Sequence, residues 1–302
     1  AIQDFTGAVV VLERDTGRVL AMASSPSFDP NSANLNSPVT QWLTYFPDTS
    51  GRFFNRATQG QYPPGSIFKI ISLAAAYESG IFEVDTVIDC PNTWDTIEGV
   101  SLDNWTVEKD LPPDGFLSSQ QALMRSCNPW FYTIGQTLYN NAFPDLIKET
   151  AEGFGLGAQT GLGVVEEAAG QVKSEDRTTS GGGSPVFHAV QQAIGQSTTL
   201  VTPIQAAVYA AAMGNGGTLY QPQLVERIEA TDGTITLQFE PLVNGELPIS
   251  PETLEAVKTG MRMVTNDPRG TAYRTFANMS IVVYGKTGTA SVQGLDPHAW
   301  FI

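Results

Sequence analysis

The chain begins with two short runs of apolar, β-favouring residues that are separated by a polar turn. The runs are Ala8 to Glu13 and Val19 to Ser24, and Arg14-Asp15-Thr16-Gly17-Arg18 lies between them. Asp and Gly are common in tight hairpin turns because they tolerate positive φ angles. This pattern predicts a β-hairpin near the start of the chain.

Three helices are predicted in the first half of the chain. The apolar run from Ile67 to Ser79 follows two prolines and ends at a glycine, which indicates a largely buried helix. Ser118-Ser119-Gln120-Gln121 is a capping-box pattern for a helix through Arg125. A further helix is expected over Pro129 to Tyr139, because proline favours the first helical position. Ser126-Cys127-Asn128 is therefore expected at a junction between two helices.

The second half of the chain mixes helical and strand patterns. We expect helices from Thr202-Pro203 to Met213 and from Ser250 to Val264, a hairpin of Leu219 to Ala230 with Thr234 to Phe239, and a strand over Ser280 to Tyr284. Three stretches lack sustained periodicity: Pro26 to Tyr62 is expected to be surface loop, Glu83 to Gly115 resists assignment, and the glycine-rich Ser174 to Ser184 is expected to be a mobile loop.

Composition and charge exclude several classes of protein. The 302 residues are 41% hydrophobic and carry a net charge of −15, which indicates a folded chain and disfavours a nucleic acid partner by repulsion from phosphates. Two histidines and two cysteines are too few for the usual metal hydrolase, four-thiolate zinc or disulfide-framework patterns, so no metal or cofactor is expected. No run approaches the ~20 apolar residues of a membrane span. The chain starts at Ala1 and stops inside an apolar run, so we expect truncation at both ends.

The first motif with chemical content is Ser66-Ile67-Phe68-Lys69 at the start of the predicted buried helix. Residues three apart share a helix face, so the Lys69 amine can lie close to the Ser66 hydroxyl. A lysine can activate a serine nucleophile when burial or a second cation lowers its pKa. Alone, the motif is better explained by a serine at a helix start and a surface lysine one turn later.

Two further motifs lie at places that suit a site. Ser126-Cys127-Asn128 occupies the junction between helices, and Lys286-Thr287-Gly288-Thr289 follows the expected strand at Ser280 to Tyr284. Thr287 and Thr289 would share one face of a strand, and Gly288 would allow another backbone to approach. Two of the six lysines, Lys69 and Lys286, lie within the three motifs.

In this order, Ser-x-x-Lys, Ser-x-Asn and Lys-Thr-Gly resemble the penicillin-binding proteins and serine β-lactamases. Much more of the chain is similar to class B penicillin-binding proteins of the elongation type. The similar segments are Thr16 to Asn31, Asn55-Arg56-Ala57, Tyr62 to Ser66, Ala193 to Gln196 with Thr202-Pro203, Asn215-Gly216-Gly217, Gly270-Thr271-Ala272 and His298 to Ile302.

The resemblance implies a transpeptidase domain over residues 1–302 with an α/β (α+β) fold, an antiparallel sheet flanked by helices. The last strands of that fold would follow Ile302. One of them would lie between the N-terminal hairpin and the strand at Ser280 to Ala290, so a gap in the sheet is expected there.

The resemblance also implies a role for each motif residue. Ser66 would be the nucleophile, Lys69 its base, Ser126 the proton relay to the leaving amine, and Asn128 the ligand of the substrate amide. Lys286 would tune Lys69 and Ser126, while Thr287 and Thr289, with Gly288 between them, would bind the substrate carboxylate. The backbone N–H groups of Ser66 and Thr289 would form the oxyanion hole.

The implied activity is cross-linking of peptidoglycan stem peptides by a D,D-transpeptidase that β-lactams acylate. The parent protein would be membrane-anchored, with this domain outside the cytoplasmic membrane, working beside a lipid-linked glycan polymerase. A D,D-carboxypeptidase, a serine β-lactamase and a non-enzymatic β-lactam sensor remain alternatives.

A few residues invite other interpretations. Glu166 and Glu167 could be compared with a deacylating glutamate, but a solvated acidic turn is expected. No Gly-x-Ser-x-Gly elbow presents a serine to His188 or His298. Cys127 is expected to be packed and not reactive. The stretch Ser174 to Ser184 stands where members of the family often have a Leu-Pro segment and an aromatic residue.

Overall fold

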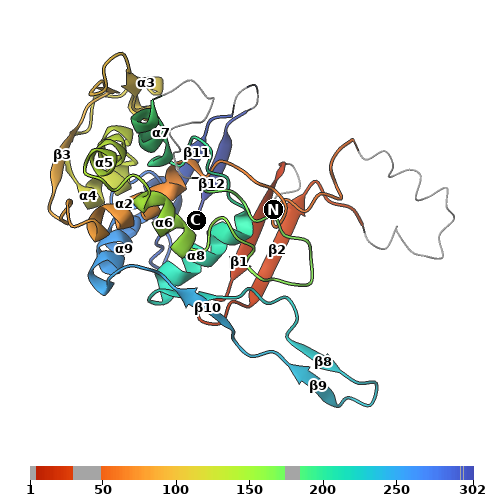
Figure 1. Ribbon diagram of the computed structural model, residues 1–302. Coiled ribbons are helices and arrows are strands. Elements are labelled where there is room, and N and C mark those ends of the chain that lie inside the picture. Colours follow the sequence, from red (N-terminus) through yellow and green to blue (C-terminus); the bar gives the residue numbers. More distant parts are fainter. Residues whose placement is uncertain (1–4, 30–48, 174–183, 293, 295) are drawn as a thin grey trace.

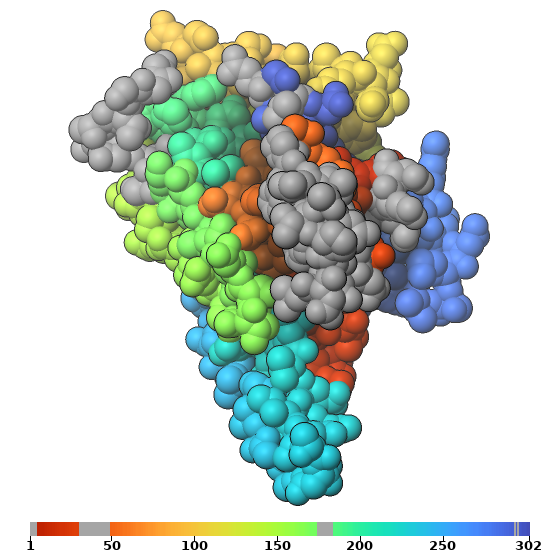
Figure 2. Space-filling view, turned by 90° about the vertical axis from the view of Figure 1, so that its right-hand side faces the viewer, coloured from red at the N-terminus to blue at the C-terminus, as the bar shows by residue number. Residues whose placement is uncertain are grey.

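The computed structural model describes residues 5–29, 49–173, 184–292, 294 and 296–302 (Figure 1). Most of the expected glycine-rich loop and residues 30–48 of the expected surface loop lie outside these described residues. Helices α2, α4, α5, α6 and α9 gather on one side of the molecule, and the N-terminal strands lie on the other, against α8. Strands β8 and β9 extend from the body and form its narrow end (Figure 2).

The helices and strands are interspersed along the chain in short runs of each kind. The helices are η2 (Gly65–Phe68, a 3₁₀ turn), α2 (Lys69–Glu78), α3 (Trp105–Glu108), α4 (Ser119–Arg125), α5 (Asn128–Asn140), α6 (Leu146–Gly153), α7 (Pro185–Gln192), α8 (Pro203–Asn215), α9 (Pro251–Asn266) and α10 (Tyr273–Phe276). The strands are β1 (Gly7–Leu12), β2 (Val19–Ser25), β3 (Val87–Cys90), β4 (Thr93–Trp94), β5 (Leu102–Asp103), β6 (Gly115–Ser118), β7 (Thr218–Tyr220), β8 (Arg227–Glu229), β9 (Ile235–Gln238), β10 (Val243–Glu246), β11 (Thr287–Ala290) and β12 (His298–Phe301).

Helix α2 is the centre of the hydrophobic core. Every residue from Lys69 to Ala76 is buried, as expected for a helix that is apolar on all sides. Helices α4, α5, α6 and α9 pack around it. The predicted buried helix is therefore confirmed, with the difference that its first turn, Gly65–Phe68, is a 3₁₀ helix.

The local signals for the hairpin and for helix starts are also confirmed. Strands β1 and β2 pair in antiparallel register. Ser118 accepts from the N–H of Gln121 and the Gln121 side chain accepts from the N–H of Ser118, so the capping box is complete. Pro129 lies in the first turn of α5, where its missing N–H costs no intrahelical hydrogen bond.

One strand prediction is confirmed only in part and another is wrong. The predicted hairpin is present as β8 and β9, but Leu219 to Ala230 is not one strand, because β7 pairs with β10. Pro222, between β7 and β8, has no N–H to donate to a strand ladder. Ser280 to Tyr284 is irregular, because side chains at the end of α9, those of Thr265 and Asn266, bond the Val283 carbonyl.

The region Glu83 to Gly115, which had no predicted assignment, holds short strands. Strand β3 pairs with β6, and β4 pairs with β5. Each pairing is antiparallel and spans four residue pairs or fewer. Strands this short have too little periodicity to be recognised in a sequence.

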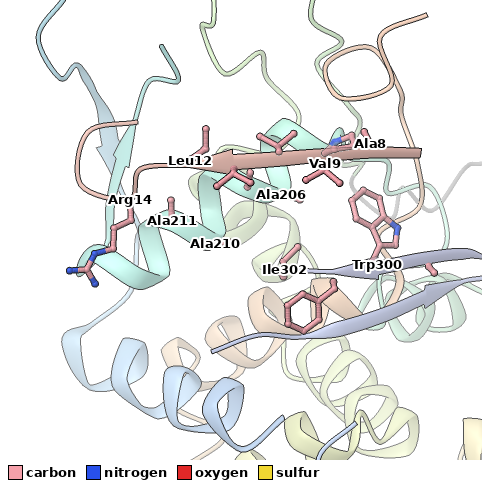
Figure 3. Close-up of a pocket in the computed structure, with 15 residues that line it drawn as sticks. Ala8, Val9, Leu12, Arg14, Ala206, Ala210, Ala211, Trp300 and Ile302 are labelled. Carbon is pink, nitrogen blue, oxygen red and sulfur yellow. The ribbon is translucent and has the colours of Figure 1, made fainter. Parts of the chain in front are cut away.

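The expected gap in the sheet is present. Strands β1 and β2 form one two-stranded sheet and β11 and β12 form another, with no ladder between them among the described residues. A groove of about 380 Å³ separates β1 from β12 (Figure 3). Its floor is a row of alanines on α8.

Helix α5 approaches α7 closely at Gly135, which yields a test of the fold. A Cβ at Gly135 would lie 2.5 Å from the carbonyl oxygen of Ala189. Because backbone must move to accept it, we expect Gly135→Ala to lower the free energy of unfolding by about 1–3 kcal/mol, measured by urea denaturation. Gly245→Ala is the control, since no atom lies within 4 Å of the added methyl group. Equal stabilities of the two variants would contradict the close helix contact.

Candidate active site

Ser66 lies in a turn that two glycines allow to approach other backbone segments. Gly65 has a φ of +53°, and a Cβ there would lie 2.5 Å from the carbonyl oxygen of Thr289. The Gly65 N–H donates to the Gly195 carbonyl at 2.9 Å, and a Cβ at Gly195 would overlap the Gly65 carbonyl. The turn that carries Ser66 is therefore held between β11 and the segment after α7.

Lys69 points its amine at the second motif. Its Nζ donates to the Ser126 carbonyl oxygen at 2.8 Å and to Asn128 Oδ1 at 2.6 Å, and lies 3.3 Å from Ser126 Oγ. A neutral amine has two N–H groups and one lone pair, so it can donate to both carbonyl oxygens and accept from the Ser126 hydroxyl. Among the described residues, no hydrogen bond joins Lys69 Nζ to the Ser66 hydroxyl, a contact that catalytic bases often make only when substrate is bound.

Burial shifts the pKa of both motif lysines. Lys69 is fully buried, and desolvation, followed by repulsion from Lys286, holds its pKa well below the ordinary value of 10.5. Lys286 is also fully buried, and desolvation lowers its pKa to about 7. The Lys286 Nζ donates to the Thr287 carbonyl at 2.8 Å. The Lys286 amine can therefore exchange its proton near neutral pH, and the charged form of Lys69 is strongly disfavoured.

Ser126 and Asn128 belong to a tight turn between α4 and α5. Ser126 is a buried residue with φ 55° and ψ 35°, the left-handed region that few residues other than glycine adopt. Cys127 is fully buried and forms a disulfide with Cys90. The expectation that Cys127 is packed and unreactive is therefore confirmed, but its covalent partner was not predicted.

The third motif presents two threonines at the free edge of β11. Lys286 and Ile302 exchange both backbone hydrogen bonds, at 2.9 and 3.2 Å. Bonded and non-bonded pairs alternate in an antiparallel ladder, so the N–H groups of Thr287 and Thr289 point away from β12. Gly288 allows this strand to lie against Ile67, whose backbone nitrogen would be 3.2 Å from an added Cβ.

The structure brings the motif residues to one cleft. The cleft has a volume of about 510 Å³, and its walls include Ser66, Ser126, Asn128, Thr287, Gly288 and Thr289. Lys69 and Lys286 are buried behind these residues and do not face the cleft opening. A substrate bound in the cleft would meet the Ser66 hydroxyl, the three further hydroxyls of Ser126, Thr287 and Thr289, and an amide, with two amines of lowered pKa behind them.

Three contributors to the site were not found from the sequence. Asn104 accepts from the N–H of Asn128 at 3.0 Å, and the hydroxyls of Thr271 and Thr287 share a hydrogen bond of 2.7 Å. The third is the disulfide. A signal for it was available, because only two cysteines occur and the resemblance implied a domain outside the cytoplasm, where disulfides form.

Glu166 and Glu167 are absent from the cleft walls. Glu166 accepts from Gln59, and Glu167 accepts from the backbone N–H groups of Thr160 and Leu162. Glu167 therefore fastens a turn and is not merely solvated. No group of three or more metal-ligating side chains lies together in the described part of the chain, and none of its helices is long and apolar enough to cross a membrane.

Comparison with known proteins decides the family. The family model of the penicillin binding protein transpeptidase domain matches residues 7–302. The chain belongs to this family. Among curated transpeptidase relatives, it is 31% identical to the peptidoglycan D,D-transpeptidase PbpA of Mycolicibacterium smegmatis over 98% of the chain and 58% of PbpA. It is 31% identical to the peptidoglycan D,D-transpeptidase MrdA of Escherichia coli K12 over 95% of the chain and 44% of MrdA.

Solved transpeptidase structures confirm the predicted fold. The imipenem acyl-enzyme complex of penicillin-binding protein A from M. tuberculosis superposes with a TM-score of 0.83 and 28% identity, over 98% of this chain and 65% of that one. A peptidoglycan synthase complex that coordinates polymerization and crosslinking superposes with a TM-score of 0.83 and 29% identity, over 96% of this chain and 47% of that one. The chain thus spans about half the length of the curated relatives it matches.

The first prediction from the site concerns the buried base. An arginine at position 69 stays protonated and cannot accept the Ser66 proton. We expect Lys69→Arg to reduce acylation by a fluorescent penicillin below detection. Because residue 69 has no exposed surface, thermal unfolding must confirm that the variant folds, and Lys69→Met supplies a smaller, uncharged second variant. Acylation at near the wild-type rate in either folded variant would remove Lys69 from the mechanism.

The second prediction concerns pH and stability. The folded chain holds Lys286 with a pKa of about 7, whereas the unfolded chain binds that proton up to about pH 10.5. The unfolded state therefore binds more protons between these values, and stability must rise with pH through this window. From pH 7 to 9 we expect Lys286 to contribute about 2 kcal/mol to the rise.

Urea denaturation of Lys286→Met at pH 7 and pH 9 measures this contribution. The rise should shrink by about that amount in the variant. Lys173→Met, which removes an exposed lysine, is the control and should keep the rise of the wild type. A rise in Lys286→Met as large as that of the wild type would show that the buried amine is not the source.

Proposed function

We propose that this chain is the catalytic domain of a peptidoglycan D,D-transpeptidase that cross-links stem peptides through an acyl-enzyme at Ser66 and that β-lactams acylate. The observation that carries the proposal is the convergence of Ser66, Ser126, Asn128, Thr287 and Thr289 on one cleft with two buried lysines behind it. The relatives named peptidoglycan D,D-transpeptidase and the acyl-enzyme structures of similar fold support it.

The first half of the reaction transfers the acyl group to the enzyme. Ser66 Oγ attacks the carbonyl carbon of the penultimate D-Ala, and its proton passes to the neutral amine of Lys69. The N–H groups of Ser66 and Thr289 stabilise the oxyanion by hydrogen bonds. Such bonds stabilise charge most strongly where water is excluded. The C–N bond then breaks, and the terminal D-Ala leaves with a proton relayed through Ser126.

The remaining motif residues bind the substrate and set the charge. Thr287 and Thr289, with Gly288 between them, bind the terminal carboxylate, and Asn128 holds the substrate amide. Burial lowers the pKa of Lys69, and the charge of Lys286 lowers it further. In the second half, an amine of a neighbouring stem peptide attacks the ester carbonyl and loses its proton to the base. The C–O bond to Ser66 then breaks, and the base returns a proton to the Ser66 oxygen.

The proposed setting is the outer side of the cytoplasmic membrane, with a membrane-anchored parent protein. The Cys90–Cys127 disulfide supports it, because such bonds persist mainly in oxidising compartments. We propose a lipid-linked glycan polymerase as partner. The similarity to a synthase complex that coordinates polymerization and crosslinking supports this assignment.

The acyl-enzyme formed with a penicillin should be long-lived. Hydrolysis needs a base that activates water beside the ester, and neither Glu166 nor Glu167 lines the cleft. The carboxylates that do line it, Asp103 and Glu108, belong to exposed residues, and Asp103 accepts from the Thr93 hydroxyl.

Intact mass spectrometry of the protein at its natural length should show one penicilloyl adduct that persists for many minutes to hours. Peptide mass analysis after digestion should place this adduct on a peptide that contains Ser66. Ser66→Ala should show none. Rapid return to the unmodified mass with multiple turnovers would make the protein a β-lactamase and exclude the proposed function.

A further inference from the structure

The turn that carries Ser126 is held by one neighbouring segment of the chain. Cys90 is bonded covalently to Cys127, and Asn104 Oδ1 accepts from the N–H of Asn128 at 3.0 Å. Trp105 Nε1 donates to the carbonyl of Arg125 at 3.0 Å. Cys90, Asn104 and Trp105, which we call the brace, thus contact Cys127, Asn128 and Arg125, so that they hold Asn128 directly and Ser126 through its two neighbours.

The brace is itself well fixed. Cys90 and Asn104 are almost completely buried, and Asn104 Nδ2 lies 3.7 Å from Cys90 Sγ, within reach of a weak hydrogen bond. The Asn104 N–H donates to the Asn92 carbonyl at 2.7 Å, and the Thr106 hydroxyl donates to Asn92 Oδ1 at 2.8 Å. A segment with these internal bonds can hold the turn in one place.

Ser126 needs such support. A serine in the left-handed region is strained, and strained residues persist at functional sites only when the surroundings over-determine them. The Ser126 carbonyl, the Ser126 hydroxyl and Asn128 Oδ1 are the groups around the Lys69 amine. Any relaxation of the turn would therefore displace the surroundings of the base together with the relay serine.

We propose that the brace is a positioning element for the transpeptidase reaction, which holds Ser126 and Asn128 in reactive geometry around the Lys69 amine. The inference rests on the proposed function. Ser126 and Asn128 touch the reacting groups. Cys90 does not line the cleft and acts through them, and Asn104, which lines the cleft beside Asn128, acts through its bond to the Asn128 N–H. Thr287 and Thr289 lie on a different element, so the brace should influence the chemical step more than carboxylate binding.

The test separates the acylation rate constant at saturating penicillin from the concentration at half-saturation. Cys90→Ser/Cys127→Ser removes the covalent bond while a serine at 127 can still cap α5, as Cys127 Sγ does for the N–H of Trp130. Asn104→Ala removes the acceptor of the Asn128 N–H, and Asn104→Asp restores an acceptor oxygen. Both sulfur atoms belong to residues without exposed surface, so substitution is a cleaner test than a reductant.

Asn215→Ala is the matched control. Asn215 Oδ1 accepts from the N–H groups of Gly217 and Thr218 at 3.1 and 2.9 Å, in a turn that does not line the cleft. Asn215 Nδ2 also donates to the carbonyls of Arg14 and Thr218, so this variant loses more side-chain hydrogen bonds than Asn104→Ala, outside the cleft. Thermal unfolding of every variant records the loss of stability.

We expect the acylation rate constant to fall about 10-fold to 100-fold in the double serine variant and in Asn104→Ala, as for small misplacements of catalytic groups. The half-saturating concentration should change little, Asn104→Asp should recover part of the rate, and Asn215→Ala should acylate like the wild type. If the double variant does not fold, Asn104→Ala, which keeps the disulfide, decides the question.

Two results would overturn the inference alone, with a wild type that acylates normally. One is an unchanged rate constant in a folded Asn104→Ala variant. The other is a loss of rate that follows the loss of thermal stability equally in Asn104→Ala and Asn215→Ala. A wild type that penicillin does not acylate would overturn both the inference and the proposed function.

Discussion

The burial of the Lys69 amine is the constraint on which the arrangement of the site depends. An amine without access to water is costly to keep charged, and the nearby Lys286 raises that cost, so the pKa of Lys69 falls. The same burial requires hydrogen-bond partners, which Ser126 and Asn128 provide. The burial of one amine thus lowers its pKa and draws the second motif to the first.

Close backbone contacts set the rest of the geometry. Gly65 and Gly195 allow the turn that carries Ser66 to touch β11 and the segment after α7 through close backbone contacts. Gly288 does the same between β11 and Ile67. Backbone contacts of this kind vary less than packing through flexible side chains, which suits a site whose groups must meet within fractions of an ångström.

The fold was predictable from the sequence wherever the signal was local. The capping box at Ser118 and Gln121, the proline at the start of α5 and the apolar run of α2 each indicated the element that the structure contains. The strand expected at Leu219 to Ala230, which is present only in part, and the one expected at Ser280 to Tyr284, which is absent, both had β-favouring residues. Whether such residues form a strand depends on a partner, and that partner lies far away in the chain.

The sequence by itself determined the chemical groups of the site and their grouping into motifs, because Ser66 and Lys69 share one helical turn and Thr287 and Thr289 share one strand. Only the tertiary structure decided that Lys69 bonds the second motif, that Cys127 is paired with Cys90, and that Asn104 holds Asn128. These contacts join residues 24 to 59 positions apart. Spacing along a chain reports on neighbours within a few residues, whereas burial and long-range pairing exist only once the core has closed.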